Sequence, residues 1–260
     1  MQQNIFQEPQ MLPLSVVIIT FNEEKNIARC LDSIQGIADD IVVVDSFSTD
    51  KTEEICKKYK VNFVQCKWQG YSLTKNFANQ LAKNDWILSL DADEVLSDEL
   101  KQSVLKVKKE GLLITAKFNR LTNYCGHWIK HCGWYPDVKV RMFDRRITLW
   151  EGTIHEELKF SEDISLVHLA GDCLHYSYYT LEQHYKQADK FTSIAAQDLF
   201  SQGKKASVLK LIVSPIIKFL RDYIFNLGFL DGSAGFTVCK ISAYATFLKY
   251  KKLRNIYKPS

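Results

Sequence analysis

The sequence predicts an α/β fold, in which an open and mostly parallel sheet is flanked by helices and followed by a helical C-terminal extension. Over the first hundred residues, short apolar runs rich in β-branched residues alternate with segments of helical periodicity. That alternation is typical of a parallel sheet built from β-α units. From about Thr180 the helical pattern continues without such strands. We therefore expect a sheet domain over residues 1–178 and a helical, basic extension over residues 179–260.

Local patterns predict the individual elements. The continuous apolar run Leu14–Thr20 predicts a strand that is covered on both faces. Residues 27–34 carry apolar side chains at helical spacing, and Asn22 offers an N-cap for that helix. Asp50 offers a cap for the next helix, and Glu53 can complete a capping-box pair. Further strands are expected over residues 41–44, 61–64, 86–90, 112–118 and 137–144, and further helices over residues 75–82, from 97 onward, over 181–200 and over 208–227.

Composition and missing motifs exclude several classes of protein. Lys+Arg 34 against Asp+Glu 30 gives a net charge of +4, which is too small to indicate binding to nucleic acid. The seven cysteines show no Cys-x-x-Cys spacing, which favours reduced thiols and a cytoplasmic location. Residues 1–12 lack the pattern of a signal peptide, and no apolar run reaches the length of about 18 residues that a membrane-spanning helix needs. Neither a Gly-x-Gly-x-x-Gly nor a Walker loop is present, so a dinucleotide dehydrogenase or P-loop NTPase is disfavoured.

Polar residues follow three of the predicted parallel strands. They are the segments 21–23, 45–46 and 91–93. Ligands of open α/β sheets bind beyond the carboxyl ends of the strands, so we expect these segments to form one site. Other roles remain open at this point. Asn22 can cap a helix, Asp45 can form a turn, and Asp91 and Asp93 can interact with the dipole of the helix that begins near Ser97.

The acids after the fourth strand predict a cation site. Asp91 and Asp93 lie two residues apart, directly after the buried strand Ile87–Leu90. At a strand end or tight turn, both carboxylates can face one hard metal ion, and a bound diphosphate can complete its ligand shell.

Three ordered segments resemble the motifs of family 2 glycosyltransferases of the GT-A fold. They are residues 15–24 (SVVIITFNEE), 42–50 (VVVDSFSTD) and 90–94 (LDADE), and the resemblance extends over about residues 14 to 160. It implies nucleotide-sugar contacts from the first two segments and from the first acid of the third, namely Thr20, Asn22, Glu23, Asp45 and Asp91. It also implies that Mg²⁺ or Mn²⁺ on the diphosphate is bound by Asp93, with Asp91 close by.

One position departs from the pattern of the family. Members usually have an Arg-Asn pair before the Asp-x-Asp strand, whereas this chain has Lys75-Asn76. Lysine supplies the same charge but not the bidentate fork of arginine. We expect Lys75 to contact phosphate.

An inverting transfer also needs a base for the acceptor hydroxyl, and Glu156 is the candidate. The segments 141–143 and 152–156 resemble lipopolysaccharide-core transferases of this family, which supports the choice. Glu157 and Asp137 remain alternatives, and Glu156 can instead form only an ion pair with Arg141. His155 is expected to orient the carboxylate or the acceptor.

Acceptor contacts are expected from His155, Arg141 and Trp134. Trp134 belongs to the segment 124–136, whose aromatic residues and glycines suit a loop that stacks on sugar rings. Its two cysteines and two histidines also allow a zinc site, but their spacing matches no standard one.

The C-terminal extension predicts attachment to a membrane surface. Over residues 208–227 a narrow polar stripe of Ser207, Lys210, Ser214, Lys218 and Arg221 borders a broad apolar face. Such a helix can lie in a membrane interface. The same face can pack on the sheet domain or on a second subunit, and Pro215 can begin a separate helix.

Together these observations and the resemblance predict an inverting, metal-dependent hexosyltransferase at the inner face of the cytoplasmic membrane. The expected donor is UDP-glucose, and the expected acceptor is a lipid-linked oligosaccharide such as the lipopolysaccharide inner core. The alternatives are transfer to polyprenyl phosphate or to a protein, a nucleotidyltransferase, whose Gly-rich loop is missing here, and a membrane-attached protein that binds sugar nucleotides without catalysis.

Overall fold

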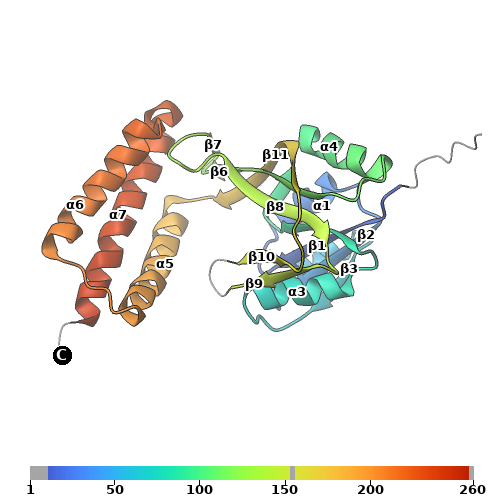
Figure 1. Ribbon diagram of the computed structural model, residues 1–260, viewed down its shortest axis with the longest axis horizontal. Coiled ribbons are helices and arrows are strands. Elements are labelled where there is room, and N and C mark those ends of the chain that lie inside the picture. The colour runs from blue at the N-terminus through green and yellow to red at the C-terminus, as the bar shows by residue number, and fades with distance from the viewer. Residues whose placement is uncertain (1–10, 153–155, 258–260) are drawn as a thin grey trace, which may run out of the picture. The chain divides into compact units, whose positions relative to one another are not determined.

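The computed structural model describes residues 11–152 and 156–257 (Figure 1). The strands are β1 (Leu14–Thr20), β2 (Asp40–Asp45), β3 (Asn62–Gln65), β4 (Trp86–Asp91), β5 (Glu94–Leu96), β6 (Thr115–Tyr124), β7 (His127–Ile129), β8 (Asp137–Asp144), β9 (Thr148–Glu151), β10 (Glu157–Phe160) and β11 (Leu166–Tyr178). The helices are α1 (Ile27–Ser33), α2 (Thr52–Cys56), α3 (Tyr71–Leu81), α4 (Asp98–Lys109), α5 (Leu181–Ser201), α6 (Val208–Leu220) and α7 (Gly232–Ile256). The α/β prediction is therefore confirmed.

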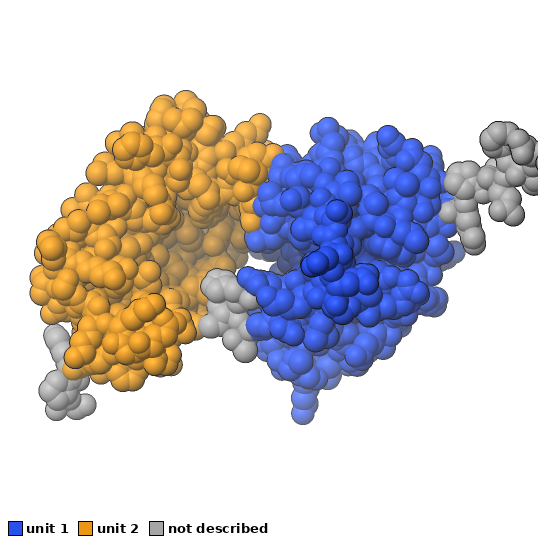
Figure 2. All heavy atoms as spheres, in the orientation of Figure 1, with its two compact units in different colours: residues 1–120, 138–175 blue, residues 121–137, 176–260 orange. Residues whose placement is uncertain are grey.

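The chain forms two compact units, which Figure 2 shows in blue and orange. The first, here called the sheet unit, comprises Met1–Arg120 and Val138–His175. The second, the helical unit, comprises Leu121–Asp137 and Tyr176–Ser260. The division into folding domains at residue 178 stays a prediction.

The main sheet has the strand order β3-β2-β1-β4-β8-β6-β11-β5, with β7 paired to β6. The strands β3, β2, β1 and β4 run parallel, as the β-α alternation predicts. In contrast, β8 pairs with β4 and β5 pairs with β11 in antiparallel register. The parallel part thus contains the strand ends that were expected to form the site.

Apolar side chains cover both faces of the sheet unit. One core joins the sheet to α1 and α4 through residues such as Leu31, Leu90 and Val104, and the other joins it to α3 through Ala78 and Val44. Figure 1 shows the corresponding layers, with α1 and α4 on one side of the sheet and α3 on the other. Burial on both faces explains the unbroken apolar pattern of β1 and β4.

Two predicted helix caps are wrong. The helix α1 begins after Asn26 rather than after Asn22, and α2 begins after Lys51. The Asp50 carboxylate still accepts a hydrogen bond from the Thr52 N–H at 2.9 Å, but no capping box forms. Loop contacts described below hold Asn22 instead.

The sequence patterns missed the long strand β11. The strand contains Gly171, which has a φ of +93°. A Cβ atom at this position would lie 2.2 Å from the backbone nitrogen of Leu100. Glycine is required here because β11 passes against the start of α4.

The helical unit has a core of its own, to which Tyr124, Ile129, Val238 and Cys239 belong. Pro215 lies inside α6 and does not begin a separate helix. A π-helical turn (Arg221–Phe225) and a 3₁₀ turn (Gly228–Asp231) follow α6, so the regular helix is shorter than predicted. Within the described parts of the chain, no helix combines the length and the hydropathy that crossing a bilayer requires.

Candidate active site

The candidate site lies at the carboxyl ends of β1, β2 and β4. The parallel register pairs Thr20 of β1 with Asp45 of β2. It also pairs Ile19 of β1 with Asp91 of β4. Since the three strands are adjacent and end at the same level, the polar residues that follow them are brought to one edge of the sheet.

The loops after β1 and β2 are hydrogen-bonded to each other. The Asn22 N–H donates to Ser48 Oγ at 2.7 Å, and the Thr49 N–H donates to Asn22 Oδ1 at 2.8 Å. Ser48 in turn donates to the buried carboxylate of Asp45 through its N–H and its hydroxyl. Asn22 and Phe47 have φ values of +56° and +61°, a strained conformation for residues other than glycine that occurs often at ligand sites. Asn22 and Asp45 therefore build one rim of the site.

Glu23 is held just inside this rim. Its N–H donates to Thr52 Oγ1 at 2.8 Å, and its carboxylate accepts from Asn26 Nδ2 at 2.6 Å. Burial raises the pKa of Glu23 to about 7, and the charge of Asp93 adds to the effect, while the Asn26 hydrogen bond opposes it. A carboxyl group in this state can change its charge when a ligand binds beside it.

Asp91 is clamped between two buried cations. Lys75 Nζ lies 3.1 Å from Asp91 Oδ1, and Arg141 Nη2 donates to Asp91 Oδ2 at 2.8 Å. Burial alone would raise the pKa of Asp91, but the two cations outweigh it and hold that pKa well below its usual range. Asp91 is therefore ionised, and each carboxylate oxygen already has a cationic partner.

Arg141 is itself fixed by a carboxylate that sequence reasoning missed. Its Nη2 also donates to Glu94 Oε1 at 2.7 Å, and Glu94 is fully buried. Burial opposes the charge of Arg141, but Glu94 and Asp91 raise its pKa above the usual range. Arg141 is 4% exposed, and in this arrangement its guanidinium group binds the Asp91 carboxylate. Its expected contact with the acceptor stays a prediction.

Asp93 is paired with a histidine that lies 82 residues later in the chain. His175 Nε2 lies 3.1 Å from Asp93 Oδ2. The antiparallel register of β11 with β5 places His175 opposite Glu94, which brings its ring beside the neighbouring Asp93. Burial lowers the pKa of His175, yet the charge and hydrogen bond of Asp93 raise it overall. No local sequence pattern indicates this pair, because only the strand pairing creates it.

Glu156 and Asp91 share a cationic partner, Lys75, which lies on α3. Lys75 Nζ lies 3.2 Å from Glu156 Oε1, so one ammonium group bridges Glu156 and Asp91. Among the described residues, Glu156 thus forms its ion pair with Lys75 and not with Arg141, which was the alternative partner. The Lys75 side chain is 1% exposed and lies over the Trp150 ring, 4.7 Å from its centroid.

The next residue of α3 holds the strand that leads to Glu156. Asn76 donates to the Trp150 carbonyl and accepts from the Trp150 N–H, both at 2.9 Å. Ser72 donates to the Gly152 carbonyl at 2.6 Å. A single helix face therefore orients both Asp91 and the segment of Glu156.

Three buried polar atoms of residues at this site have no hydrogen-bond partner among the described residues. They are Thr20 Oγ1, at the end of β1, the indole nitrogen of Trp150 and Arg141 Nε. Buried polar groups are almost always hydrogen-bonded, so such atoms are candidates for contact with a ligand.

The other predicted residues are placed differently. Glu157 is exposed and lies 3.2 Å from Lys159, and Asp137 belongs to the helical unit. Trp134 also belongs to the helical unit, where its ring packs in an edge arrangement on Tyr124. His155 lies outside the described residues.

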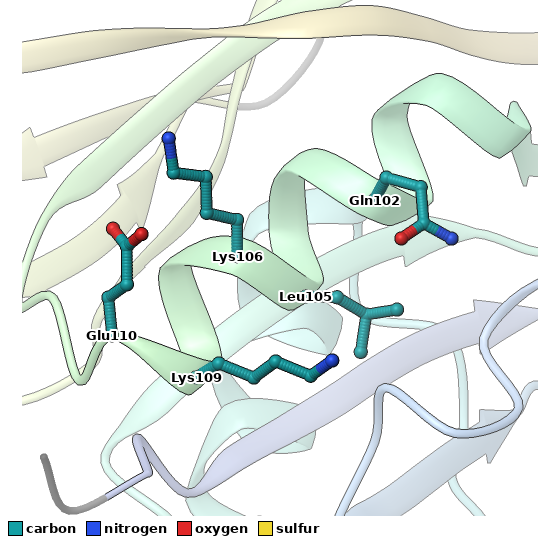
Figure 3. Close-up of a pocket in the computed structure, with 5 residues that line it drawn as sticks. All are labelled: Gln102, Leu105, Lys106, Lys109 and Glu110. Carbon is teal, nitrogen blue, oxygen red and sulfur yellow. The ribbon is translucent and has the colours of Figure 1, made fainter. Parts of the chain in front are cut away.

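A surface pocket in the sheet unit is separate from these groups. Figure 3 shows it along one helix, α4, where it is lined by Gln102, Leu105, Lys106, Lys109 and Glu110. No residue of the candidate site lines it. The pocket does not contribute to the site at the strand ends.

Comparisons with known proteins agree on one family. Residues 15–184 match the family described as glycosyl transferase family 2. A glycosyltransferase of Rickettsia felis is 34% identical over 263 residues, which cover 94% of this chain and 90% of the relative. The lipopolysaccharide core biosynthesis glycosyltransferase LpsC of Rhizobium meliloti is 28% identical over 257 residues, which cover 93% of this chain and 92% of LpsC.

A solved structure shares the fold at much lower identity. It is the mannosyltransferase PcManGT from Pyrobaculum calidifontis in complex with GDP-Man and Mn²⁺. The TM-score is 0.52 at 12% identity, and the match covers 98% of this chain and 91% of that structure.

Proposed function

Because the chain belongs to glycosyltransferase family 2, we propose that the site at the strand ends transfers a hexose from a nucleotide sugar with inversion at the anomeric carbon. The proposed donor is UDP-glucose, and the proposed acceptor is a lipid-linked oligosaccharide such as the lipopolysaccharide inner core. The observation that carries the proposal is the Lys75 bridge, which holds Asp91 and Glu156 to one ammonium group at 3.1 and 3.2 Å. A donor-binding acid and a candidate base are thereby kept next to each other.

The rim after β1 and β2 supports the binding of the nucleotide. Thr20 Oγ1 is buried without a hydrogen-bond partner in the described part of the chain, and hydrogen bonds hold Asn22 and Asp45 beside it. In the proposal these three residues and Glu23 contact the nucleotide, while Lys75 and Asp91 lie near the phosphates.

The side chains around Asp93 fit a divalent cation. A carboxylate and an imidazole, Asp93 and His175, lie 3.1 Å apart, and this is a donor pair that Mn²⁺ accepts, while Mg²⁺ relies more on carboxylates and water. Within residues 11–152 and 156–257, no group of three or more His, Cys, Asp or Glu side chains is placed to hold a metal. Phosphate oxygens and water would therefore complete the shell. A bound Mg²⁺ or Mn²⁺ would stabilise the negative charge of the leaving diphosphate.

Glu156 is the proposed base. It accepts the proton of the acceptor hydroxyl as that oxygen bonds to the anomeric carbon, while the bond from this carbon to the diphosphate oxygen breaks on the opposite face. The Lys75 ammonium group, 3.2 Å away, keeps the Glu156 carboxylate oriented.

The similarity to LpsC supports a lipopolysaccharide-type acceptor. In the proposal His155 and Arg141 contact this acceptor, and Asp93 holds the metal with Asp91 close by. Since such acceptors are anchored in lipid, the enzyme works at the inner face of the cytoplasmic membrane.

Binding of the donor is tested by thermal unfolding with UDP, GDP, CMP and dTDP sugars, each with and without Mn²⁺. We expect a metal-dependent rise in stability with UDP-glucose, of about 3 kcal/mol at a hundredfold excess over its Kd. Asp93→Asn should abolish the rise, whereas Asp98→Asn at an exposed position on α4 should keep it. An equal rise in Asp93→Asn and the wild type would refute the assignment of the metal site.

Catalysis is tested with Glu156→Gln, which keeps the size of the side chain but cannot accept the proton. We expect kcat to fall by about 10² to 10⁴ while the donor-dependent thermal shift is retained. Glu157→Gln is the matched control, because its carboxylate is exposed and pairs with Lys159. Wild-type turnover in Glu156→Gln would remove Glu156 as the base.

A further inference from the structure

The helix α6 exposes an unusually large apolar surface. None of its residues is buried. Its exposed apolar side chains fall at spacings of three and four, which places them on one arc of the helix. They are Val208 (55% exposed), Leu209 (71%), Ile212 (57%), Val213, Ile216 (55%), Ile217 (59%) and Leu220. We call this set the α6 face.

The segment that follows α6 continues this character. Phe225 is 78% exposed, and Ile224, Leu227, Phe229 and Leu230 are each more than 40% exposed. Contiguous apolar surface of this extent is rare on proteins that remain free in water, so the α6 face has a partner.

The chain segment that carries the α6 face is strongly basic. Residues 200–257 contain ten Lys and Arg and only two acids, a net of +8. Both acids are occupied inside the helical unit, since Asp222 pairs with Lys218 and the Asp231 carboxylate accepts from the His131 N–H. The side chains of Asp222 and Asp231 are 2% and 7% exposed. No acid of residues 200–257 therefore offsets the positive charge at the surface.

The basic side chains border the apolar arc rather than interrupt it. Lys210 is exposed on the flank of α6 and Arg221 just after its end, and Lys204 and Lys205 are exposed just before the helix begins. Long basic side chains in this position can keep their charges at the level of lipid head groups while the apolar residues insert.

From this combination we infer that the α6 face docks on an anionic lipid bilayer. A second copy of the chain docked through the same face would bring two basic borders together, which electrostatic repulsion opposes. A bilayer with anionic head groups can bury the apolar arc and bind its basic border. The helix α6 lies along the bilayer surface, because α6 is too short to span the bilayer. The inference rests on the proposed function and deepens it, because it names the surface that brings the enzyme to a lipid-borne substrate.

The inference is tested by sedimentation of the full chain with vesicles of phosphatidylcholine, with and without phosphatidylglycerol. We expect binding to the anionic vesicles that weakens at high salt. Ile212→Glu with Ile216→Glu should lower the partition coefficient about a hundredfold or more, since each buried isoleucine contributes about tenfold. Lys204→Gln with Lys205→Gln should lower it about fivefold per charge on anionic vesicles only.

Matched controls separate loss of docking from loss of folding. Leu113→Glu changes an apolar residue of the sheet unit that is 70% exposed, and it should bind vesicles like the wild type. Unchanged thermal unfolding and an unchanged donor-dependent shift in the Ile212→Glu, Ile216→Glu variant would show that only docking is lost.

Three outcomes would overturn the inference. They are the absence of wild-type binding to anionic vesicles, wild-type binding by the Ile212→Glu, Ile216→Glu variant, and a wild-type dimer that this variant converts to monomers. Vesicle binding without any donor-dependent thermal shift would instead count against the proposed catalytic site and leave the docking surface standing.

Discussion

Glu94 shows how a single buried residue organises the candidate site. Its Oε1 accepts from Arg141 at 2.7 Å and from Arg120 at 3.4 Å, and its Oε2 accepts from the Asp91 N–H at 3.0 Å. Glu94 thus fixes both the backbone of Asp91 and the cation that binds the Asp91 carboxylate. Its role is to position Asp91, because its own oxygens are engaged inside the protein.

Replacing Glu94 tests this role. Glu94→Gln removes the charge that balances Arg141 in a buried setting, and breaking such a pair costs about 3–5 kcal/mol of unfolding free energy. We expect a loss in this range in urea denaturation, together with weaker donor binding. Glu99→Gln, at an exposed position on α4, should change stability by less than about 0.5 kcal/mol. Equal stability of the two variants would contradict the positioning role.

At the scale of elements, α5 depends on a capping box and on one buried histidine. Thr180 and Gln183 form the capping box that begins the helix. His184 follows in the first turn, is 6% exposed, and its Nδ1 lies 3.0 Å from the Tyr124 hydroxyl. Burial lowers the pKa of His184 to about 4. The ring is therefore neutral in the folded helical unit at neutral pH.

The stability of the helical unit should therefore depend on pH. Between pH 6.5 and 4 the unfolded chain binds a proton at His184, whereas the folded chain does not. The contribution of neutral His184 to the free energy of unfolding is therefore complete above pH 6.5 and is lost as the pH falls toward 4. The shift corresponds to about 3 kcal/mol. We expect urea denaturation followed by helix content to show this slope, and His184→Gln to reduce it. The same change at exposed His168 is the control, and an unchanged slope in His184→Gln would contradict the prediction.

At the scale of the whole molecule, the two units differ in core and in charge. The cores of the sheet unit and of the helical unit share no residue among those that the structure describes. Residues 200–257 carry a net charge of +8, whereas the complete chain carries only +4. The remaining residues are therefore net acidic. This separation fits a division in which one unit holds the chemistry and the other supplies an anionic-lipid surface.

Local sequence determined much of the fold and its class. The strands β1 and β8 span the residues that their apolar or alternating patterns predict, because burial of one or both faces imposes that pattern on the chain itself. The family 2 motifs are contiguous, so family membership and the GT-A fold could be predicted from residues 14 to 160. Asp91 and Asp93 were recognised for the same reason, although their roles in binding stay predictions.

Only the tertiary structure decided which distant residues meet these motifs. Glu156 reaches Lys75 across 81 residues, and His175 reaches Asp93 across 82, through contacts that α3 and the β11–β5 register create. Glu94 gave no local sign of its role, because its two cationic partners lie on other strands. Likewise, the apolar pattern of α6 was visible in the sequence, but periodicity does not tell a buried face from an exposed one. The physical reason is common to all of these cases: a local pattern records the period of an element, whereas pairing and packing choose its neighbours.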